Sequence, residues 1–138
     1  MSGPQEHEIS KVSLPQPTAE LPYCNALVAA AIDYIQQHAC DGINTEDVLD
    51  HLADRGMIIS RSTLERRFRR IIGVSPRAAI LAVQIKRAQQ MLATTDYPIV
   101  QIAELVGISR PEHFSATFRR ATGMLPSQVR RKAIHNAI

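Results

Sequence analysis

The chain has 138 residues, which is room for one domain or for two small helical lobes that share a core, and this length excludes a large multidomain enzyme. Aromatic residues make up only 4% of the sequence and tryptophan is absent. The interior must therefore consist mainly of alanine, valine, isoleucine and leucine with a few phenylalanines, a composition that suits packed helices.

The net charge of +3 is divided unevenly along the chain. Residues 1–54 contain one basic and nine acidic side chains, a net charge of −8, whereas residues 55–138 contain fifteen basic and four acidic ones, a net charge of +11. Thirteen of those fifteen basic residues are arginine, whose planar guanidinium suits phosphates and guanine edges better than the lysine ammonium does. The asymmetry indicates a polyanionic partner for the second part of the chain.

Four prolines interrupt residues 1–22, where no hydrophobic period is sustained, so we expect a flexible or extended leader there. Apolar residues then recur at helical spacing and predict a first helix over 26–38. Asn44 or Thr45 can cap a second helix that runs to about Arg55, before Gly56. The residues expected on the buried faces of these two helices are Leu27, Val28, Ala31, Ile32, Ile35, Val48, Leu49, Leu52 and Ala53.

Five further helices are predicted after Gly56, which makes the fold all-α with seven helices. Ser60 is a suitable N-cap for the third, which Gly73 ends, and Ser75 with Pro76 opens the longest helix, which runs to about 94. The last three cover about 98–106, 111–122 and 126–134. Their expected buried residues, in chain order, are Leu64, Phe68, Ile71, Ile80, Leu81, Ile85, Ala88, Met91, Leu92, Ile99, Ile102, Ala103, Val106, Phe114 and Phe118.

An internal repeat with an offset of fifty residues and no gap organises these helices. Each copy consists of a helix, a short turn, a second helix, a glycine and a helix begun by proline, which is the helix-turn-helix plan. We therefore expect one unit at about 44–73, a linker helix at about 75–94 and a second unit at about 98–123. The matched pairs are Leu49 and Ile99, Leu52 and Ile102, Ala53 and Ala103, Ile58 and Ile108, Leu64 and Phe114, Phe68 and Phe118, Gly73 and Gly123, and Pro76 and Pro126.

In a helix-turn-helix unit the second helix enters the DNA major groove by its N-terminal part, while the first crosses the backbone. The outward residues of the two second helices are therefore the candidate DNA-binding residues. They are Arg61, Ser62, Glu65, Arg66 and Arg69 in the first copy and Glu112, His113, Ser115, Ala116 and Arg119 in the second.

Arg66 is the strongest candidate for base reading, because arginine can donate two hydrogen bonds to guanine, and Glu65 can accept one from a cytosine amino group. Three alternatives stay open. The arginine run also fits a solvated helix face. His113 also fits a partly buried helix histidine, and Ala116 either touches a thymine methyl or only avoids a clash.

The predicted linker helix, about seventeen residues from Pro76 to Leu92, is about 25 Å long. With its turns it can separate two recognition helices by about 34 Å, one turn of the duplex. One chain could then read two successive major grooves of double-stranded DNA.

Residues 26–135 resemble the AraC/XylS family of transcriptional regulators, and within it the xylose-type regulators. The resemblance rests on four stretches in the family's order: 60–68, 85–92, 102–107, and Phe118-Arg119-Arg120 with Gly123 and Pro126. It implies that residues 23–138 form a homeodomain-like DNA-binding domain of two helix-turn-helix subdomains, and that residues 1–22 are the remnant of a linker to a sugar-sensing domain. It also implies RNA polymerase as a partner during activation, and a sugar effector that acts only through that upstream domain.

This sequence departs from the family pattern at several positions. The segment from Leu52 to Ile59 is about one helical turn longer than in the xylose type, so the family pattern does not predict the tilt of the first recognition helix. Gln84 stands where the wider family often has arginine, and Ala116 where many members have a base-reading arginine, so second-groove specificity is in question. Ile108 and Val129 replace the phenylalanine and tyrosine that are frequent there.

Two other classes of function, an enzyme and a protein-interaction module, fit the sequence less well. An enzyme would need a catalytic constellation, yet the sequence has no glycine-rich phosphate loop and no serine or cysteine nucleophile motif. A protein-interaction module is the stronger alternative, because helical repeats also bind proteins and Met57, Ile58 and Ile59 would form an apolar surface if they were exposed. A salt titration separates the two, since only phosphate contacts make affinity fall steeply with salt.

No metal, cofactor or membrane segment is expected. Cys24, Cys40, His38 and His51 lack the paired spacing of zinc ligands, and we interpret the cysteines as reduced thiols on or near a helix. No apolar stretch is long enough for a membrane span or a secretion signal, so a cytoplasmic location is the default.

Overall fold

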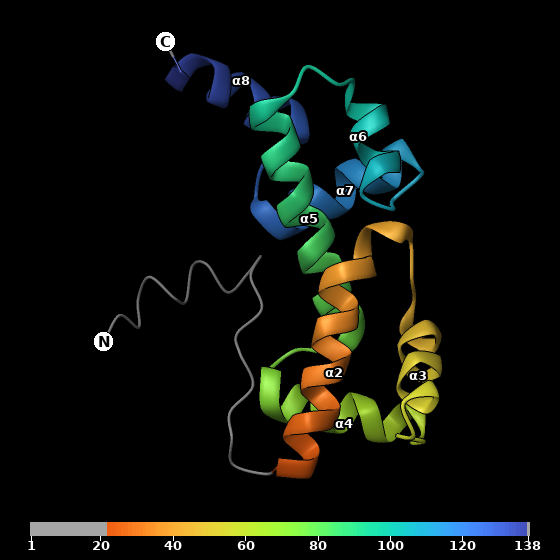
Figure 1. Cartoon of the computed structure of the whole chain (residues 1–138). Coiled ribbons are helices and arrows are strands. Elements are labelled where there is room, and N and C mark those ends of the chain that lie inside the picture. Colours follow the sequence, from red (N-terminus) through yellow and green to blue (C-terminus); the bar gives the residue numbers. More distant parts are fainter. Residues whose placement is uncertain (1–21, 138) are drawn as a thin grey trace, which may run out of the picture.

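The computed structural model describes the backbone of residues 22–137 and the side chains of residues 26–134, and in this part of the chain it contains seven α-helices and no strand (Figure 1). The seven-helix, all-α prediction is confirmed. The predicted leader, 1–22, lies outside the described residues except for Pro22. The elements are α2 (Pro22–His38), the short 3-10 helix η1 (Ala39–Asp41), α3 (Thr45–Asp54), α4 (Arg61–Ile72), α5 (Pro76–Thr94), α6 (Ile99–Leu105), α7 (Pro111–Thr122) and α8 (Pro126–Ala137).

The helices begin where side chains accept the otherwise unpaired backbone N–H groups. Asn44 accepts a hydrogen bond from the backbone N–H of Asp47 at 3.0 Å, and the Asp47 carboxylate accepts one from the Asn44 N–H at 2.9 Å, so α3 has a complete capping box. Ser60 and Ser75 cap α4 and α5 in the same way. The predicted N-cap Ser60 is confirmed, the cap of α3 is Asn44 rather than the alternative Thr45, and α5 opens at Ser75 and Pro76 as predicted. Only α2 and α8 differ by more than two residues from their predicted bounds, α2 because it begins at Pro22, which the first turn of a helix tolerates.

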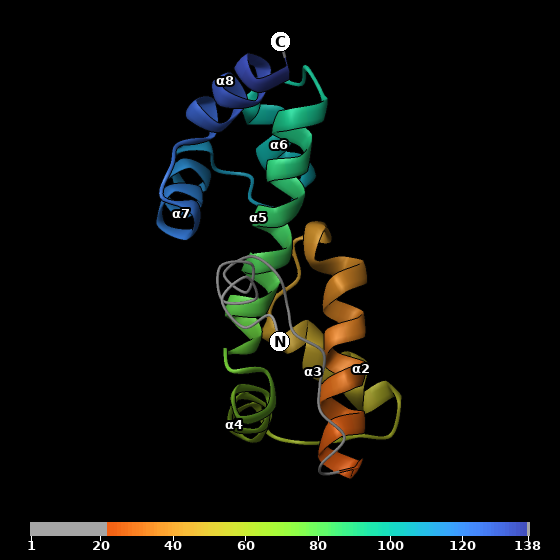
Figure 2. The same cartoon turned by 90° about the vertical axis from the view of Figure 1, so that its left-hand side faces the viewer.

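The chain has two hydrophobic cores. The helices that form them lie toward opposite ends of α5 (Figures 1 and 2). Residues of α2, α3 and α4 form the first core, and residues of α6 and α7 form the second. The helix contacts of the two units are equivalent. Helix α2 contacts α3, α4 and α5, and α5 contacts α6, α7 and α8 in the same way. Helix α5 is therefore the last helix of the first unit and the first helix of the second.

The two cores use opposite faces of α5. Ala79 and Ile80 are buried in the first core, whereas Ile85, Ala88 and Leu92 are buried in the second. At about 100° of rotation per residue, the middle of the first group lies roughly opposite the middle of the second. The apolar residues of α5, which the sequence analysis gave as one series, therefore belong to two faces.

The two helix-turn-helix turns differ in length by one residue. Residues 55–60 join α3 to α4, whereas residues 106–110 join α6 to α7. In the first turn the N–H of Met57 donates to the carbonyl of Leu52 at 2.8 Å, and in the second the N–H of Ile108 donates to the carbonyl of Ala103 at 2.9 Å. These equivalent bonds have an offset of 51, while the recognition helices α4 and α7 keep the offset of 50.

The repeat without a gap is therefore wrong for the pairs that precede α4. Leu52 corresponds to Ala103, and both are fully buried. Ala53, expected on the buried face, is exposed. Ile58 is 83% exposed because it occupies the additional position, while Met57 takes the place of Ile108 against the core.

Arg130 in α8 binds the end of α5 and the segment that follows it. Its guanidinium donates to the backbone carbonyls of Leu92, Thr95 and Tyr97 at 3.3, 3.0 and 2.6 Å. Carbonyl groups at the end of a helix lack partners within it, so one arginine fork here satisfies several acceptors at once.

We predict that Arg130→Met lowers the free energy of unfolding by about 1–3 kcal/mol, because it removes charged hydrogen bonds while keeping an apolar stem of similar length. Urea denaturation followed by circular dichroism measures this change. Arg131→Met is the matched control, since Arg131 is exposed on the same helix. Equal stability of the two variants would contradict the prediction.

Candidate nucleic-acid interface

Helix α4 is held in place by one apolar face and presents a basic one. Leu64 and Phe68 are fully buried in the first core. Arg66 and Arg69, with Arg70, are exposed, and so is Ser62 in the first turn. Among the described residues, no acidic side chain forms an ion pair with Arg66. Its guanidinium therefore remains available for a ligand outside the protein.

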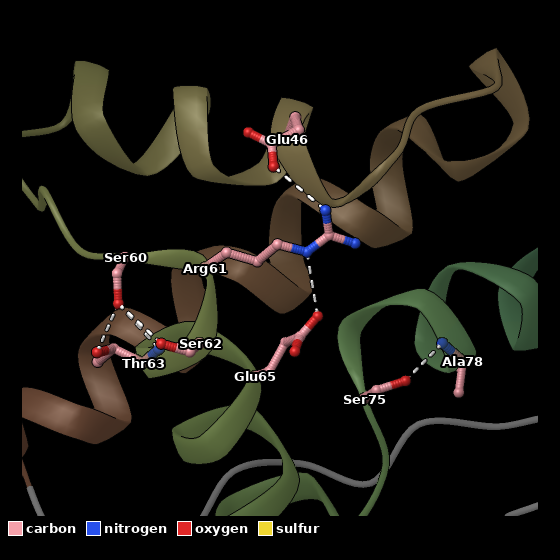
Figure 3. A network of polar contacts seen from close by, with 8 residues as sticks. All are labelled: Glu46, Ser60, Arg61, Ser62, Thr63, Glu65, Ser75 and Ala78. Atoms are coloured by element: carbon pink, nitrogen blue, oxygen red, sulfur yellow. Dashed lines mark hydrogen bonds and ion pairs between the residues drawn. The ribbon is translucent and has the colours of Figure 1, made fainter.

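Arg61 differs from the other arginines of α4 because two carboxylates bind it (Figure 3). Its Nε donates to Glu65 at 3.2 Å and its Nη1 donates to Glu46 of α3 at 3.4 Å. All three side chains are about half exposed, so these pairs add little to stability. They occupy an arginine that is a candidate DNA-binding residue.

Helix α7 repeats the arrangement with a less basic surface. Phe114 and Phe118 are fully buried, with ring centroids 5.7 Å apart. Ser115 is half-buried. The other four candidate residues, Glu112, His113, Ala116 and Arg119, are exposed, as is Arg120.

The alternative interpretation of His113 as a partly buried helix histidine is wrong, because the residue is exposed.

The apolar surface that a protein-interaction module would need is smaller than the sequence allows. Of Met57, Ile58 and Ile59, only Ile58 is exposed, and the other two are partly buried against the first core.

The two recognition helices are held apart by α5, whose 19 residues span about 28 Å. In Figure 2, α4 lies at the lower end of α5, α7 lies beside its upper half, and α2 is on the other side of α5 from α7. Both recognition helices are thus placed by the same rigid element.

A cleft of about 630 Å³ lies between the two units. It is bounded by the start of α3, the start of α4, one face of α5, the turn before α7, and α7 itself. Its charged and titratable lining residues are predominantly basic, with Glu46 as the single acid: Glu46, Arg61, Arg77, Arg110, His113 and Arg120.

Arg77 and Arg110 were missed as candidate residues, although both have a visible signal in the sequence. Arg77 follows Pro76 in the first turn of α5, and Arg110 precedes Pro111 at the start of α7. Both therefore stand at helix starts, next to the recognition helices. What the sequence could not supply is that they line the same cleft, since 33 positions separate them.

Nothing in the described part of the chain suggests metal binding or a membrane span. No three side chains of His, Cys, Asp or Glu there are grouped as a metal would require. Cys40 is half-buried, and burial raises the pKa of its thiol, which disfavours the thiolate that a metal needs. Among the same residues, no helix has both the length and the apolar character to span a bilayer.

Comparison with known proteins gives consistent results. The family described as a helix-turn-helix domain matches residues 55–132. The xylose operon regulatory protein of Escherichia coli (strain K12) is 34% identical over 103 residues, which are 75% of this chain and 25% of that protein. This chain thus spans about a quarter of the length of the curated relatives it matches first.

Two solved structures are similar over most of the described helices. The C-terminal domain of AraT, a response regulator from Geobacillus stearothermophilus, has a TM-score of 0.71 and 29% identity, and the similarity covers 83% of this chain and 88% of that one. The DNA-binding domain of AdpA, solved in complex with a target DNA, has a TM-score of 0.68 and 26% identity, and the similarity covers 76% of this chain and 90% of that one.

Proposed function

This chain belongs to the AraC-type family of helix-turn-helix domains, and from this premise we propose that residues 23–138 bind double-stranded DNA sequence-specifically as part of a transcription regulator. One observation carries the proposal. The same construction, a recognition helix anchored by two buried side chains with polar and basic residues outward, occurs twice on one linker helix. Each copy enters one major groove, and the two grooves are successive.

In the first groove Arg66 donates two hydrogen bonds to a guanine, and Glu65 accepts one from a cytosine amino group. The Glu65 carboxylate is partly exposed and pairs only weakly with Arg61, so it can exchange this partner for a base. In the second groove the candidates are Glu112, His113 and Ala116, with Ser115 contributing less because it is half-buried.

Phosphate contacts supply most of the sequence-independent affinity. Arg69 and Arg119 stand at the C-terminal halves of the two recognition helices, and both are exposed. The cleft arginines, Arg77 and Arg110, add positive charge between the two units, and we place the DNA backbone across this cleft. The predominance of basic side chains in this cleft supports an anionic ligand over an apolar protein partner.

The name of the xylose operon regulators supports a sugar-responsive regulator as the whole. Because the match covers about a quarter of those relatives, we place the sugar effector in a domain outside the matched region. RNA polymerase is the proposed partner when such a regulator activates transcription. The direct test of the proposal is selection of binding sites from random duplexes, followed by a salt titration on the selected site.

The first prediction concerns base reading. Arg66→Ala relaxes the base preference in one half of the site and costs about 1–3 kcal/mol on the selected sequence. Selection of binding sites with the variant measures both effects. Arg70→Ala, on the same helix, is the control and leaves the base preferences unaltered. Unchanged preferences for Arg66→Ala would refute the assignment.

The second prediction concerns phosphate contact. Arg119→Ala weakens binding to selected and unrelated duplexes to a similar extent and lowers the magnitude of the log-log salt slope by about one. Fluorescence anisotropy over a series of salt concentrations gives the slope. A loss confined to the selected sequence would assign Arg119 to base reading instead.

The third prediction is that one chain binds an asymmetric site whose contacted segments lie about 10 base pairs apart on one face of the duplex. The two recognition surfaces differ in residues and charge, so they cannot read two halves of a palindrome equally. Because α5 joins them, the second contact forms at a high effective concentration. Footprinting with analytical ultracentrifugation tests this, and a palindromic footprint that needs two chains would contradict it.

A further inference from the structure

A small polar junction joins the two units beside the middle of α5. It consists of the segment Ala39–Gly42, which follows α2, together with Gln84 of α5 and Gly107 of the turn between α6 and α7. In Figure 1 the end of α2 reaches up to this turn. At the junction the backbone of the segment after α2 lies against the turn of the second unit.

Gly107 permits this approach because it has no side chain. A Cβ atom there would lie 2.9 Å from Nε2 of Gln84, 3.0 Å from the backbone nitrogen of Gly42 and 3.1 Å from the carbonyl oxygen of Cys40. Two of these three neighbours are backbone atoms, which cannot rotate away as the end of a side chain can. A Cβ atom at position 107 therefore requires the facing backbone to give way by a few tenths of an ångström, and a φ of 93° adds strain for any residue with a side chain.

Gln84 adds a directional bond to this close approach. Its side chain is buried, and its Nε2 donates to the carbonyl of Ala39 at 2.9 Å. A buried bond of this kind is costly to break without a replacement partner. The bond ties α5 to the segment after α2, beside the turn that contains Gly107.

We infer that Gly107 and Gln84 determine which spacing between the two contacted DNA segments this chain selects. The inference rests on the proposed function. Inserting one base pair between the segments rotates the second by about 34° and moves it by about 3.4 Å. A protein with a rigid junction cannot keep both recognition helices in their grooves after this change. A protein with a loosened junction can adjust and keep part of the second contact.

The experiment measures the affinity of the full chain for the selected duplex and for versions with one base pair removed or inserted between the two segments. For the wild type we expect a loss of about tenfold or more per step, and for Gly107→Ala a loss below about threefold, with base preferences within each segment unchanged. Gly56→Ala is the matched control, because Gly56 occupies the equivalent place in the first turn with φ of 85° against 93° for Gly107, but a Cβ there has nothing within 4 Å. It keeps the wild-type spacing profile.

Gln84→Met provides a second route if Gly107→Ala does not fold, because it removes the bond to Ala39 while filling a similar volume. We expect it to flatten the profile in the same direction, and Gln90→Met, at an exposed site of α5, to leave it unchanged. A sharp wild-type profile that both junction variants retain, or a flat wild-type profile, would overturn the inference. Failure of the wild type to bind any selected duplex would instead overturn the proposed function.

Discussion

Burial of two opposite faces of α5 in two separate cores is the constraint on which the arrangement of the molecule depends. Ala79 and Ile80 satisfy one core while Ile85, Ala88 and Leu92 satisfy the other, so the helix cannot turn about its axis without exposing apolar surface at one end. Each recognition helix lies against its own core. Their relative direction thus follows from the sequence of a helix that itself carries none of the proposed base-reading residues.

The fold was largely accessible from the sequence, because its signals are local. Asn44, Ser60 and Ser75 stand immediately before helices, and caps act within one turn. The repeat was located but misaligned before α4. Leu49 and Leu52 have the same three-residue spacing as Ile99 and Ile102, so the apolar pattern fits an alignment of the two copies that is wrong by one residue. The hydrogen bonds of the two turns give the correct alignment.

The candidate site was accessible only in part. Exposure of Arg66 and Arg119 follows from their place opposite buried anchors on an amphipathic helix, which periodicity predicts. Periodicity does not predict the ion pair between Arg61 and Glu46, because fifteen positions and a turn separate these residues in the sequence. The shared cleft of Arg77 and Arg110 and the junction at Gly107 depend equally on how the two units meet, which is a tertiary property without a local signature.

The shared role of α5 also describes how such a chain is assembled. Helix α8 follows the second unit as α5 follows the first, and it contacts α5 and α7 as α5 contacts α2 and α4. The molecule thus consists of two overlapping four-helix units with one helix in common. This arrangement is closer to a short solenoid than to two domains joined by a flexible linker. Ile134 on α8 is 59% exposed, so this outer helix still has apolar surface to bury. Helix α8 thus holds the position from which a third unit of the same kind would continue the array.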